Sequence, residues 1–254
     1  MGRTNRRTAA TVITVVGDGA ESVADRIRTA EDDATVVSGE RPEEADLLVA
    51  VGESALLNAV REGTACDVLP VDVGAGVPDV ALRDLEAAVR AVREGERTVD
   101  ERSLLAAAVG NVTHHGLMDV MAVTSESAKI SEFAVETRRA GSWQTVDRVR
   151  ADGIVVATPA GTPGYGSAAG GPVLSSTLAA VAVVPVGPFR VERSHWVLSL
   201  PSRVTVARDE TPVSLLVDDE ETGPVPAHEP ITLDWGPAVT FLRTDVSRSP
   251  FERP

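Results

Sequence analysis

Apolar residues in the first hundred positions form short runs that alternate with amphipathic stretches. β-branched residues fill much of positions 10–16, and Asp46 opens the uninterrupted apolar run LLVAV. An apolar run without polar alternation is typical of a parallel strand that is buried on both faces. We predict strands at residues 10–16, 34–37, 46–51 and 68–73, and helices at residues 21–30, 55–61 and 82–93. Strands that alternate with helices indicate βαβ units around a parallel sheet.

The pattern changes near residue 100. Helical spacing disappears, apart from one candidate helix at residues 174–181, and short apolar runs are separated by Pro, Gly and acidic residues. This spacing is typical of an antiparallel β domain. Its predicted strands are residues 118–124, 133–138, 153–157, 181–186, 195–200, 203–207, 213–217 and 238–243. We therefore expect an α/β domain over residues 1–100 and a β-rich domain over residues 101–254. We leave open that the C-terminal end returns to the first domain, and we expect residues 247–254 to form a loose tail.

Charge narrows the range of partners. The chain has 38 acidic and 24 basic side chains, a net charge of −14, and a single lysine, Lys129. An acidic surface repels nucleic-acid phosphates, so we expect no nucleic-acid partner. This composition favours a salt-adapted, halophilic cytoplasmic protein over the alternative, an ordinary acidic protein encoded by GC-rich codons. No apolar run approaches the roughly 20 residues that span a bilayer, so we expect no membrane partner.

Two local patterns have ordinary structural explanations. Gly17-Asp18-Gly19 follows the first strand but lacks the Lys-Ser/Thr of a phosphate-binding P-loop, so we interpret it as a strand-to-helix turn. His114 and His115 would point to opposite faces of a strand, and no cysteine or carboxylate cluster accompanies them. The sequence therefore predicts no metal site built from protein side chains alone.

The most informative segment, residues 152–174, reads DGIVVATPAGTPGYGSAAGGPVL. A predicted strand runs into a glycine-rich stretch, where few side chains separate the backbone from a ligand and positive φ angles can aim N–H groups at it. Tyr165, the only tyrosine in the chain, lies in this stretch, and its flat ring suits a nucleotide base or ribose. On chemistry alone, a nucleotide-binding turn and a tightly packed structural turn with Tyr165 as its lid fit equally well.

This segment resembles the signature of the NAD kinase family, a strand with Asp-Gly followed by T-P-x-G-S/T-x-x-Y-x-x-x-x-G-G-P. The matching residues are Asp152, Gly153, Thr158, Pro159, Gly161, Tyr165, Gly170, Gly171 and Pro172. Residues 46–60 fall where the family has a strand, a G-G-D-G-T motif and a helix, and the resemblance covers most of the chain from residue 45 onward. It implies an NAD-kinase-like fold, with an α/β N-terminal domain, an all-β C-terminal domain and a nucleotide in the cleft between them.

The resemblance also implies a reaction and a set of site residues. Family members transfer a phosphate from ATP, with Mg²⁺, to the 2′-hydroxyl of the adenosine ribose of NAD, and they usually form dimers or tetramers. The resemblance thus predicts small-molecule nucleotides as partners and a homo-oligomer. The implied residues are Glu53 as general base, Gly52 and Gly161 along the phosphates, and Ser125, Glu126, Asp152, Thr158 and Tyr165 around NAD.

The family's G-G-D-G-T motif is altered in this chain, which reads Val51-Gly52-Glu53-Ser54-Ala55. Glu53 carries its carboxylate one methylene further out than aspartate, and a misplacement of about 1 Å can cost on the order of 100-fold in rate. A carboxylate at a helix N-terminus is also favourable without catalysis. Two alternatives to NAD kinase activity therefore stay open. One is a regulatory NAD(P)-binding relative with impaired catalysis, and the other is a kinase that acts on another hydroxyl, such as that of a lipid or sugar.

Overall fold

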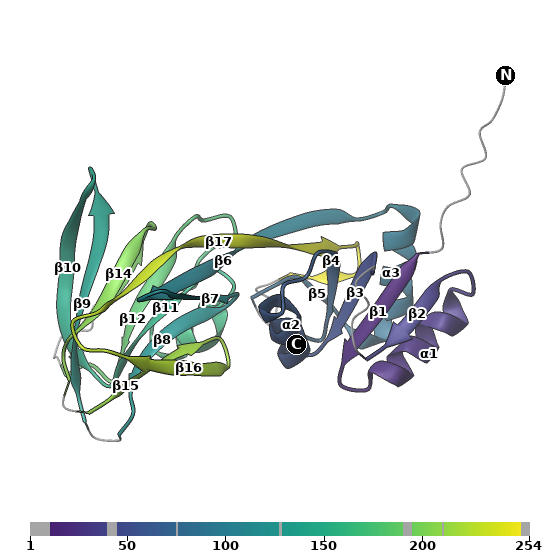
Figure 1. The fold of residues 1–254 in the computed structure, drawn as a ribbon. Helices are drawn as coiled ribbons and strands as arrows, with labels where there is room; N and C mark the ends of the chain where they lie inside the picture. The colour runs from purple at the N-terminus through teal and green to yellow at the C-terminus, as the bar shows by residue number, and fades with distance from the viewer. Residues whose placement is uncertain are drawn as a thin grey trace. The chain divides into compact units, whose positions relative to one another are not determined.

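The computed structural model describes residues 11–39, 45–74, 76–126, 129–189, 195–209 and 211–249. The chain divides into two compact units. The first, which we call the α/β unit, comprises residues 1–101 and 239–254, and the second, the β unit, comprises residues 102–238. Figure 1 shows the elements of each unit, and their types confirm the predicted fold class.

The α/β unit is built on a parallel sheet in the order β2-β1-β3-β4. Its strands are β1 (Val12–Gly17), β2 (Thr35–Ser38), β3 (Leu47–Val51) and β4 (Asp67–Val71). All residues of β3 are buried, as its uninterrupted apolar run predicts. Beyond β4 come β5 (Asp79–Val80) and β18 (Ser247–Arg248), and the end of β17 (Pro230–Arg243) also pairs with β4.

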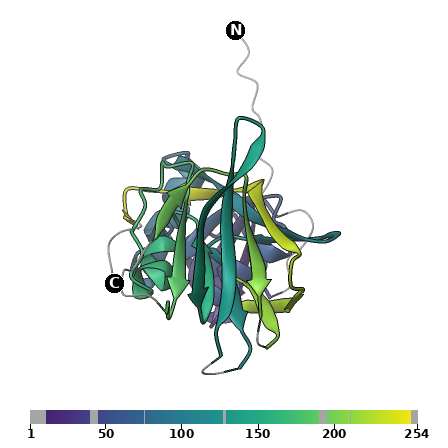
Figure 2. The same ribbon diagram turned by 90° about the vertical axis from the view of Figure 1, so that its left-hand side faces the viewer.

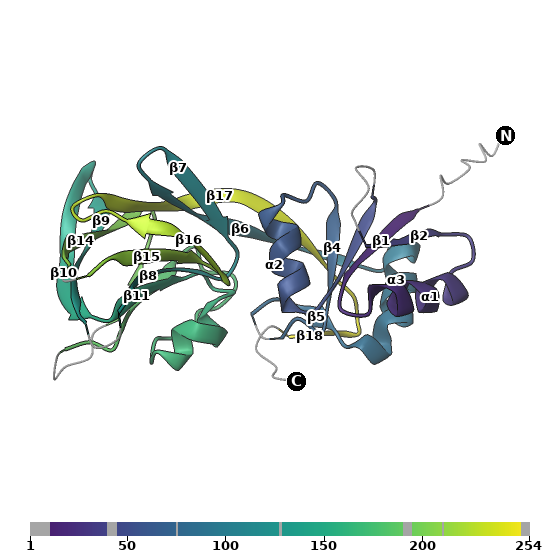
Figure 3. The ribbon, with the colours of Figure 1, turned by 60° about the horizontal axis from the view of Figure 1, so that its bottom comes forward.

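Helices cover both faces of this sheet (Figures 1 and 3). α1 (Ala20–Ala30) and α3 (Leu85–Glu94) pack on one face, where their apolar residues join those of β1, β3 and β4 in one core cluster. α2 (Glu53–Arg61) lies on the other face. α3 begins later than predicted because residues 82–84 form a 3-10 turn, and it ends at Gly95, whose left-handed backbone serves as the C-cap.

The β unit consists of two antiparallel sheets whose inner faces share one large core cluster. One sheet has the order β10-β9-β14-β17, with β6 and β7 following on β17, and the other has the order β13-β12-β11-β8-β15-β16. Figure 2 faces the first sheet, in which the β9–β10 hairpin is teal. The first sheet contains β6 (Thr98–Val109), β7 (Val112–Gly116), β9 (Ser131–Arg139), β10 (Ser142–Ala151) and β14 (Ser202–Arg208). The second contains β8 (Asp119–Thr124), β11 (Gly153–Ala157), β12 (Val181–Val186), β13 (Trp196–Leu198), β15 (Val213–Val217) and β16 (Glu220–Val225).

The predicted helix at residues 174–181 is wrong. Residues 172–180 have no helix, and strand β12 begins at Val181. Local hydroxyl groups explain the error, because Ser175 and Thr177 bond to each other and the Leu174 N–H donates to the Thr162 hydroxyl at 3.0 Å. Such bonds offer the backbone an alternative to helical pairing.

The predicted loose tail is wrong for Ser247 and Arg248, which form β18 and pair with β5. The rest of that prediction, from residue 250 onward, lies outside the described residues. None of the helices in the described part of the chain combines the length and apolar character required to cross a membrane.

Candidate functional site

A cavity of about 840 Å³ opens in the α/β unit where β1 and β3 end. Its lining includes the β1–α1 turn at Gly17 and Asp18 and the β3–α2 junction at Gly52 and Glu53. The carboxyl ends of parallel strands are the usual place for a ligand in an open α/β sheet. The two glycine-containing segments singled out in the sequence therefore meet at one cavity.

Gly17 allows the β1–α1 turn to approach the β3–α2 junction closely. Its φ angle is 107°, and a Cβ atom at this position would lie 2.1 Å from the Val51 carbonyl oxygen and 2.7 Å from the Ala55 Cβ. No larger residue fits without moving backbone. Residues 17–19 form the turn between β1 and α1, as interpreted from the sequence, and the same turn also borders the cavity.

Gly52 is the N-cap residue of α2, and no side chain caps this helix. The Gly52 N–H donates to the Val71 carbonyl at 2.9 Å, so this group is already used within the sheet. The space where a Gly52 side chain would lie is open, with no atom within 4 Å. Ser54 and Ala55, in the first turn of α2, also line the cavity, and first-turn N–H groups lack acceptors within a helix. The helix start, rather than the Gly52 N–H, is the part of this motif suited to an anion.

Glu53 is exposed at the start of α2 and lines the cavity. Its Oε2 atom lies 4.0 Å from the position that a Cβ on Gly74 would take. The turn after β4, which contains Asp72 and Gly74, is therefore a neighbour of this carboxylate. Asp18 and Glu62 also line the cavity, which gives it an acidic character.

In the β unit, the glycine-rich turn of the signature, which we call the signature turn, begins at Thr158, directly after β11. The Thr158 side chain is buried, and its hydroxyl donates to the Leu117 carbonyl at 2.6 Å while accepting the Ala160 N–H at 3.1 Å. The Thr158 N–H donates to the Met118 carbonyl at 2.9 Å. These bonds show that Thr158 shapes the turn, and its contact with NAD stays a prediction.

Gly161 is required for the same turn. A Cβ atom on Gly161 would lie 2.0 Å from the Met118 carbonyl oxygen, and the Gly161 N–H donates to the Thr158 carbonyl at 3.0 Å. Close packing against residue 118 explains why this position requires glycine, and the contact of Gly161 with phosphates stays a prediction.

Asp218 supports this arrangement from the hairpin between β15 and β16. Its carboxylate accepts the N–H groups of Leu117, Met118 and Asp119 at 2.9, 2.7 and 3.0 Å. Burial raises the pKa of the Asp218 carboxyl above its ordinary value, although the bonds from these N–H groups act in the opposite direction. Sequence reasoning missed Asp218, which has a left-handed backbone with φ 55° in this hairpin.

Tyr165 lies beside a second cavity of about 420 Å³ within the β unit. The residue is 47% exposed, and the cavity lining also includes Pro185, Gly187 and His195. Asp152 is exposed and lies next to Gly187, where an added Cβ would meet the Asp152 Oδ2 atom at 2.2 Å. Asp152 therefore neighbours Gly187, one lining residue of the cavity that Tyr165 borders.

Ser125 and Glu126 lie at the Asp152 end of β8, where the Thr124 N–H donates to the Asp152 carbonyl at 2.8 Å. The Ser125 N–H donates to the Pro212 carbonyl at 2.9 Å, and the Glu126 carboxylate accepts the Thr211 hydroxyl at 2.8 Å. The residue of β8 that lies beside the signature turn is instead Asp119, which pairs with Ala157. The predicted residues thus fall into two groups at opposite ends of β8 and β11, and sequence reasoning missed Asp119.

Comparisons with known proteins show which chains this one is similar to. A family model described as the ATP-NAD kinase C-terminal domain matches residues 117–237. The NAD kinase of Nitrosospira multiformis is 31% identical over 180 residues, which cover 67% of this chain and 60% of that protein. The NAD kinase of Methanosarcina mazei is 28% identical over 176 residues, which cover 68% and 60% of the two chains. The chain thus spans about 60% of the length of these curated relatives.

Solved structures show the same fold at lower identity. The yeast NADH kinase complexed with NADH superposes with a TM-score of 0.79 at 16% identity, covering 94% of this chain and 85% of that one. The NAD kinase from Archaeoglobus fulgidus in complex with ATP gives a TM-score of 0.74 at 23% identity, covering 92% of this chain and 94% of that one.

Proposed function

Since this chain is a divergent member of the NAD kinase family, we propose that it transfers a phosphate from ATP to the 2′-hydroxyl of the adenosine ribose of NAD. The observation that carries the proposal is the cavity of the α/β unit, where the start of α2 and the Glu53 carboxylate border the same space. Phosphoryl transfer depends mainly on positioning and on charge neutralisation. In this cavity, the N-terminus of α2 can stabilise phosphate charge, and the Glu53 carboxylate can remove a proton.

Glu53 is the proposed general base. It is exposed to the cavity, and a carboxylate within hydrogen-bond reach of the attacking hydroxyl can accept its proton in the transition state. Its extra methylene, compared with aspartate, moves the carboxylate outward from α2. We therefore expect the acceptor hydroxyl to lie correspondingly further from the helix than in relatives that have aspartate.

The acidic lining of the cavity calls for a cation to accompany a triphosphate. Among the described residues, no group of three or more His, Cys, Asp and Glu side chains could enclose a metal ion. Mg²⁺ usually keeps several waters and needs only one or two carboxylates besides the phosphates, and Asp18 would supply one. When bound, it would neutralise phosphate charge.

The dinucleotide is proposed to contact the β unit. The exposed Tyr165 ring suits stacking, and the exposed Asp152 carboxylate suits a ribose hydroxyl. Ser125 and Glu126 would reach the same ligand from β8, whose Thr124 is bonded to Asp152. Thr158 and Gly161 would shape the intervening turn rather than bind.

A second candidate is an NAD(P)-binding relative without phosphoryl transfer. One observation favours it. The Gly52 N–H is committed to Val71, and the Gly161 N–H is committed to Thr158, so neither glycine of the proposed phosphate lining offers its N–H group to a ligand.

The deciding experiment incubates the protein with NAD, ATP and Mg²⁺ in molar KCl and measures NADP with an NADP-specific dehydrogenase, alongside calorimetric titration of NAD. We expect NADP formation, and we expect Glu53→Gln to lower kcat by at least about 100-fold with NAD affinity retained. Glu94→Gln, which removes the same charge from the exposed end of α3, is the matched control and should keep wild-type turnover. Full turnover in Glu53→Gln would exclude Glu53 as the base, and NAD binding without NADP formation would favour the second candidate.

A further inference from the structure

The turn that follows β4, residues 72–74, has an unfavourable backbone conformation that other residues must stabilise. Asp72 and Gly74 both have left-handed φ angles, 48° and 87°. An aspartate in this region is uncommon and persists where surrounding groups hold it. The Asp72 N–H donates to the Val80 carbonyl at 3.0 Å, which secures only the beginning of the turn.

Asp79 supplies the remaining attachment. Its carboxylate is almost completely buried, at 3% exposure of the residue, and its Oδ2 atom accepts the Val73 N–H at 3.0 Å and the Gly74 N–H at 3.4 Å. A buried carboxylate is costly unless it is paired and hydrogen-bonded. The turn therefore depends on whatever neutralises Asp79.

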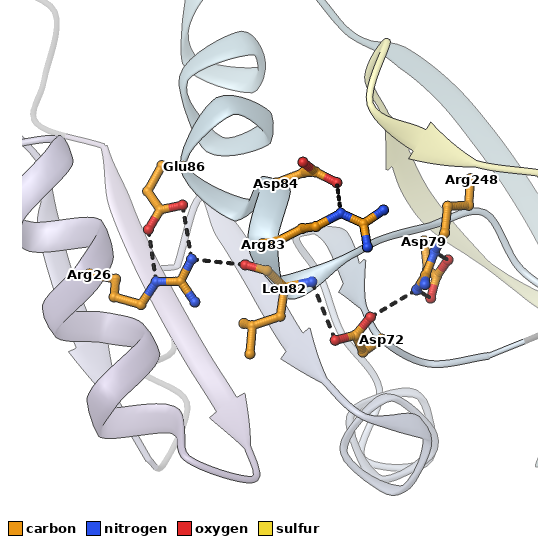
Figure 4. Close-up of polar contacts among 8 residues, drawn as sticks. All are labelled: Arg26, Asp72, Asp79, Leu82, Arg83, Asp84, Glu86 and Arg248. Atoms are coloured by element: carbon orange, nitrogen blue, oxygen red, sulfur yellow. Dashed lines mark hydrogen bonds and ion pairs between the residues drawn. The ribbon is translucent and has the colours of Figure 1, made fainter. Parts of the chain in front are cut away.

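Arg248, on β18, provides that charge (Figure 4). Its Nε donates to Asp79 Oδ1 at 2.8 Å, and its Nη2 bonds both Asp79 Oδ2 and Asp72 Oδ1, the latter at 3.0 Å. The second Asp72 oxygen accepts the Leu82 N–H at 3.3 Å. One guanidinium thus pairs with the carboxylates of both Asp72 and Asp79, in the fork geometry that lysine cannot reproduce.

The turn borders the proposed catalytic carboxylate. The position of a Cβ on Gly74 lies 4.0 Å from Glu53 Oε2, and the residue before the turn, Val71, accepts the Gly52 N–H at 2.9 Å. We infer that Arg248 is a positioning residue, which holds the Asp72–Gly74 turn as a wall beside Glu53. Its effect on catalysis rests on the proposed function, whereas its hold on the turn does not.

The test compares Arg248→Met with Arg93→Met. Arg93 is the matched control because it also pairs two carboxylates, Glu31 and Asp33, with a side chain 16% exposed against 20% for Arg248, and it has no bond to the turn. Amide hydrogen exchange measures the hold on the turn. We expect Arg248→Met to accelerate exchange at Val73 and Gly74 by about tenfold more than Arg93→Met does.

Turnover measures the catalytic consequence. We expect Arg248→Met to lower kcat for NADP formation by about tenfold with the KM for NAD little changed, since a misplaced wall affects orientation more than binding. Arg248→Lys, which keeps the charge without the fork and guards against a misfolded methionine variant, should recover part of both effects. Equal exchange at Val73 and Gly74 in the Met variants of Arg248 and Arg93 would overturn the inference. If the wild-type protein forms no NADP, the proposed function fails, while exchange still decides whether Arg248 holds the turn.

Discussion

The support that Asp218 gives to the signature turn leads to a quantitative prediction. Replacing Asp218 with alanine removes the acceptor of the N–H groups of Leu117, Met118 and Asp119. The carbonyls of Leu117 and Met118 in turn accept the hydroxyl and the N–H of Thr158. The substitution should therefore destabilise residues 117–119, to which the glycine-rich turn is hydrogen-bonded.

The size of the effect follows from the number and type of these bonds. A hydrogen bond to a charged group contributes about 1.5–3 kcal/mol net, and a donor left buried without an acceptor adds a similar cost. The unfavourable burial of the Asp218 carboxylate, visible in its raised pKa, offsets part of this gain. We therefore expect Asp218→Ala to lower the free energy of unfolding of the β unit by about 3 kcal/mol, which corresponds to roughly 10 °C in Tm.

Tryptophan fluorescence isolates the relevant unit. The three tryptophans of the chain, Trp143, Trp196 and Trp235, all belong to the β unit. Urea unfolding followed by their emission therefore reports this unit, and agreement with circular dichroism at β-sheet wavelengths would test whether its transition is two-state.

The control is Asp219→Ala, which removes the same charge from the exposed neighbouring residue. It should change stability by less than about 0.5 kcal/mol, as is usual for surface substitutions. If Asp218→Ala proved as mild as Asp219→Ala, the three N–H bonds would not support the turn, and our reasoning about this site would be refuted.

Three further predictions concern proton binding and close packing. Because the folded-state pKa of Asp218 is raised above 3.8, the folded β unit binds more protons than the unfolded chain between the two pKa values, and stability falls as pH rises through that window. We therefore expect the difference in free energy of unfolding between wild type and Asp218→Asn, measured by urea titration across this window, to decrease as pH rises. A difference that increases with pH would show that the Asp218 pKa is not raised in the folded state. Gly161→Ala places a Cβ 2.0 Å from the Met118 oxygen and should destabilise the β unit by about 3 kcal/mol by the tryptophan assay. Gly17→Ala should accelerate hydrogen exchange in β1 far more than Gly19→Ala, whose Cβ meets nothing within 4 Å, and equal effects would contradict the packing argument.

Local patterns predicted much of this fold. The buried run of β3 and the amphipathic spacing of α1 and α3 depend on the sequence of one segment, so periodicity was sufficient to locate them. Strand β10, SWQTVDRVRA, was missed because it is largely exposed and its charged residues obscure the alternation. Its place beside β9 depends on pairing with another segment, which a single run of residues does not reveal.

The candidate site was predictable only in part, for the same reason. The glycine-rich segment and Glu53 were found from their motifs, but Asp119 was missed because its proximity to the signature turn arises from the register between β8 and β11. Asp218 lies 101 residues from Leu117 along the chain, and no local pattern connects them. For Thr158 and Gly161, the motif identified the residue types, but it could not show that groups of both residues already have partners within the fold.

The path of the chain constrains the order in which its parts can be completed. The α/β unit is discontinuous, since residues 102–238 come between its two segments and residues 239–254 return to it. Arg248 is separated from Asp79 by 169 residues, so a ribosome must translate the whole β unit before β18 exists to pair with β5. During synthesis the β unit can fold as a continuous segment, whereas the α/β unit must wait with β4 and β5 lacking their later partners. The support of the Asp72–Gly74 turn by Arg248 is consequently among the last contacts to form, and a chain released early would carry the glycine-rich signature without it.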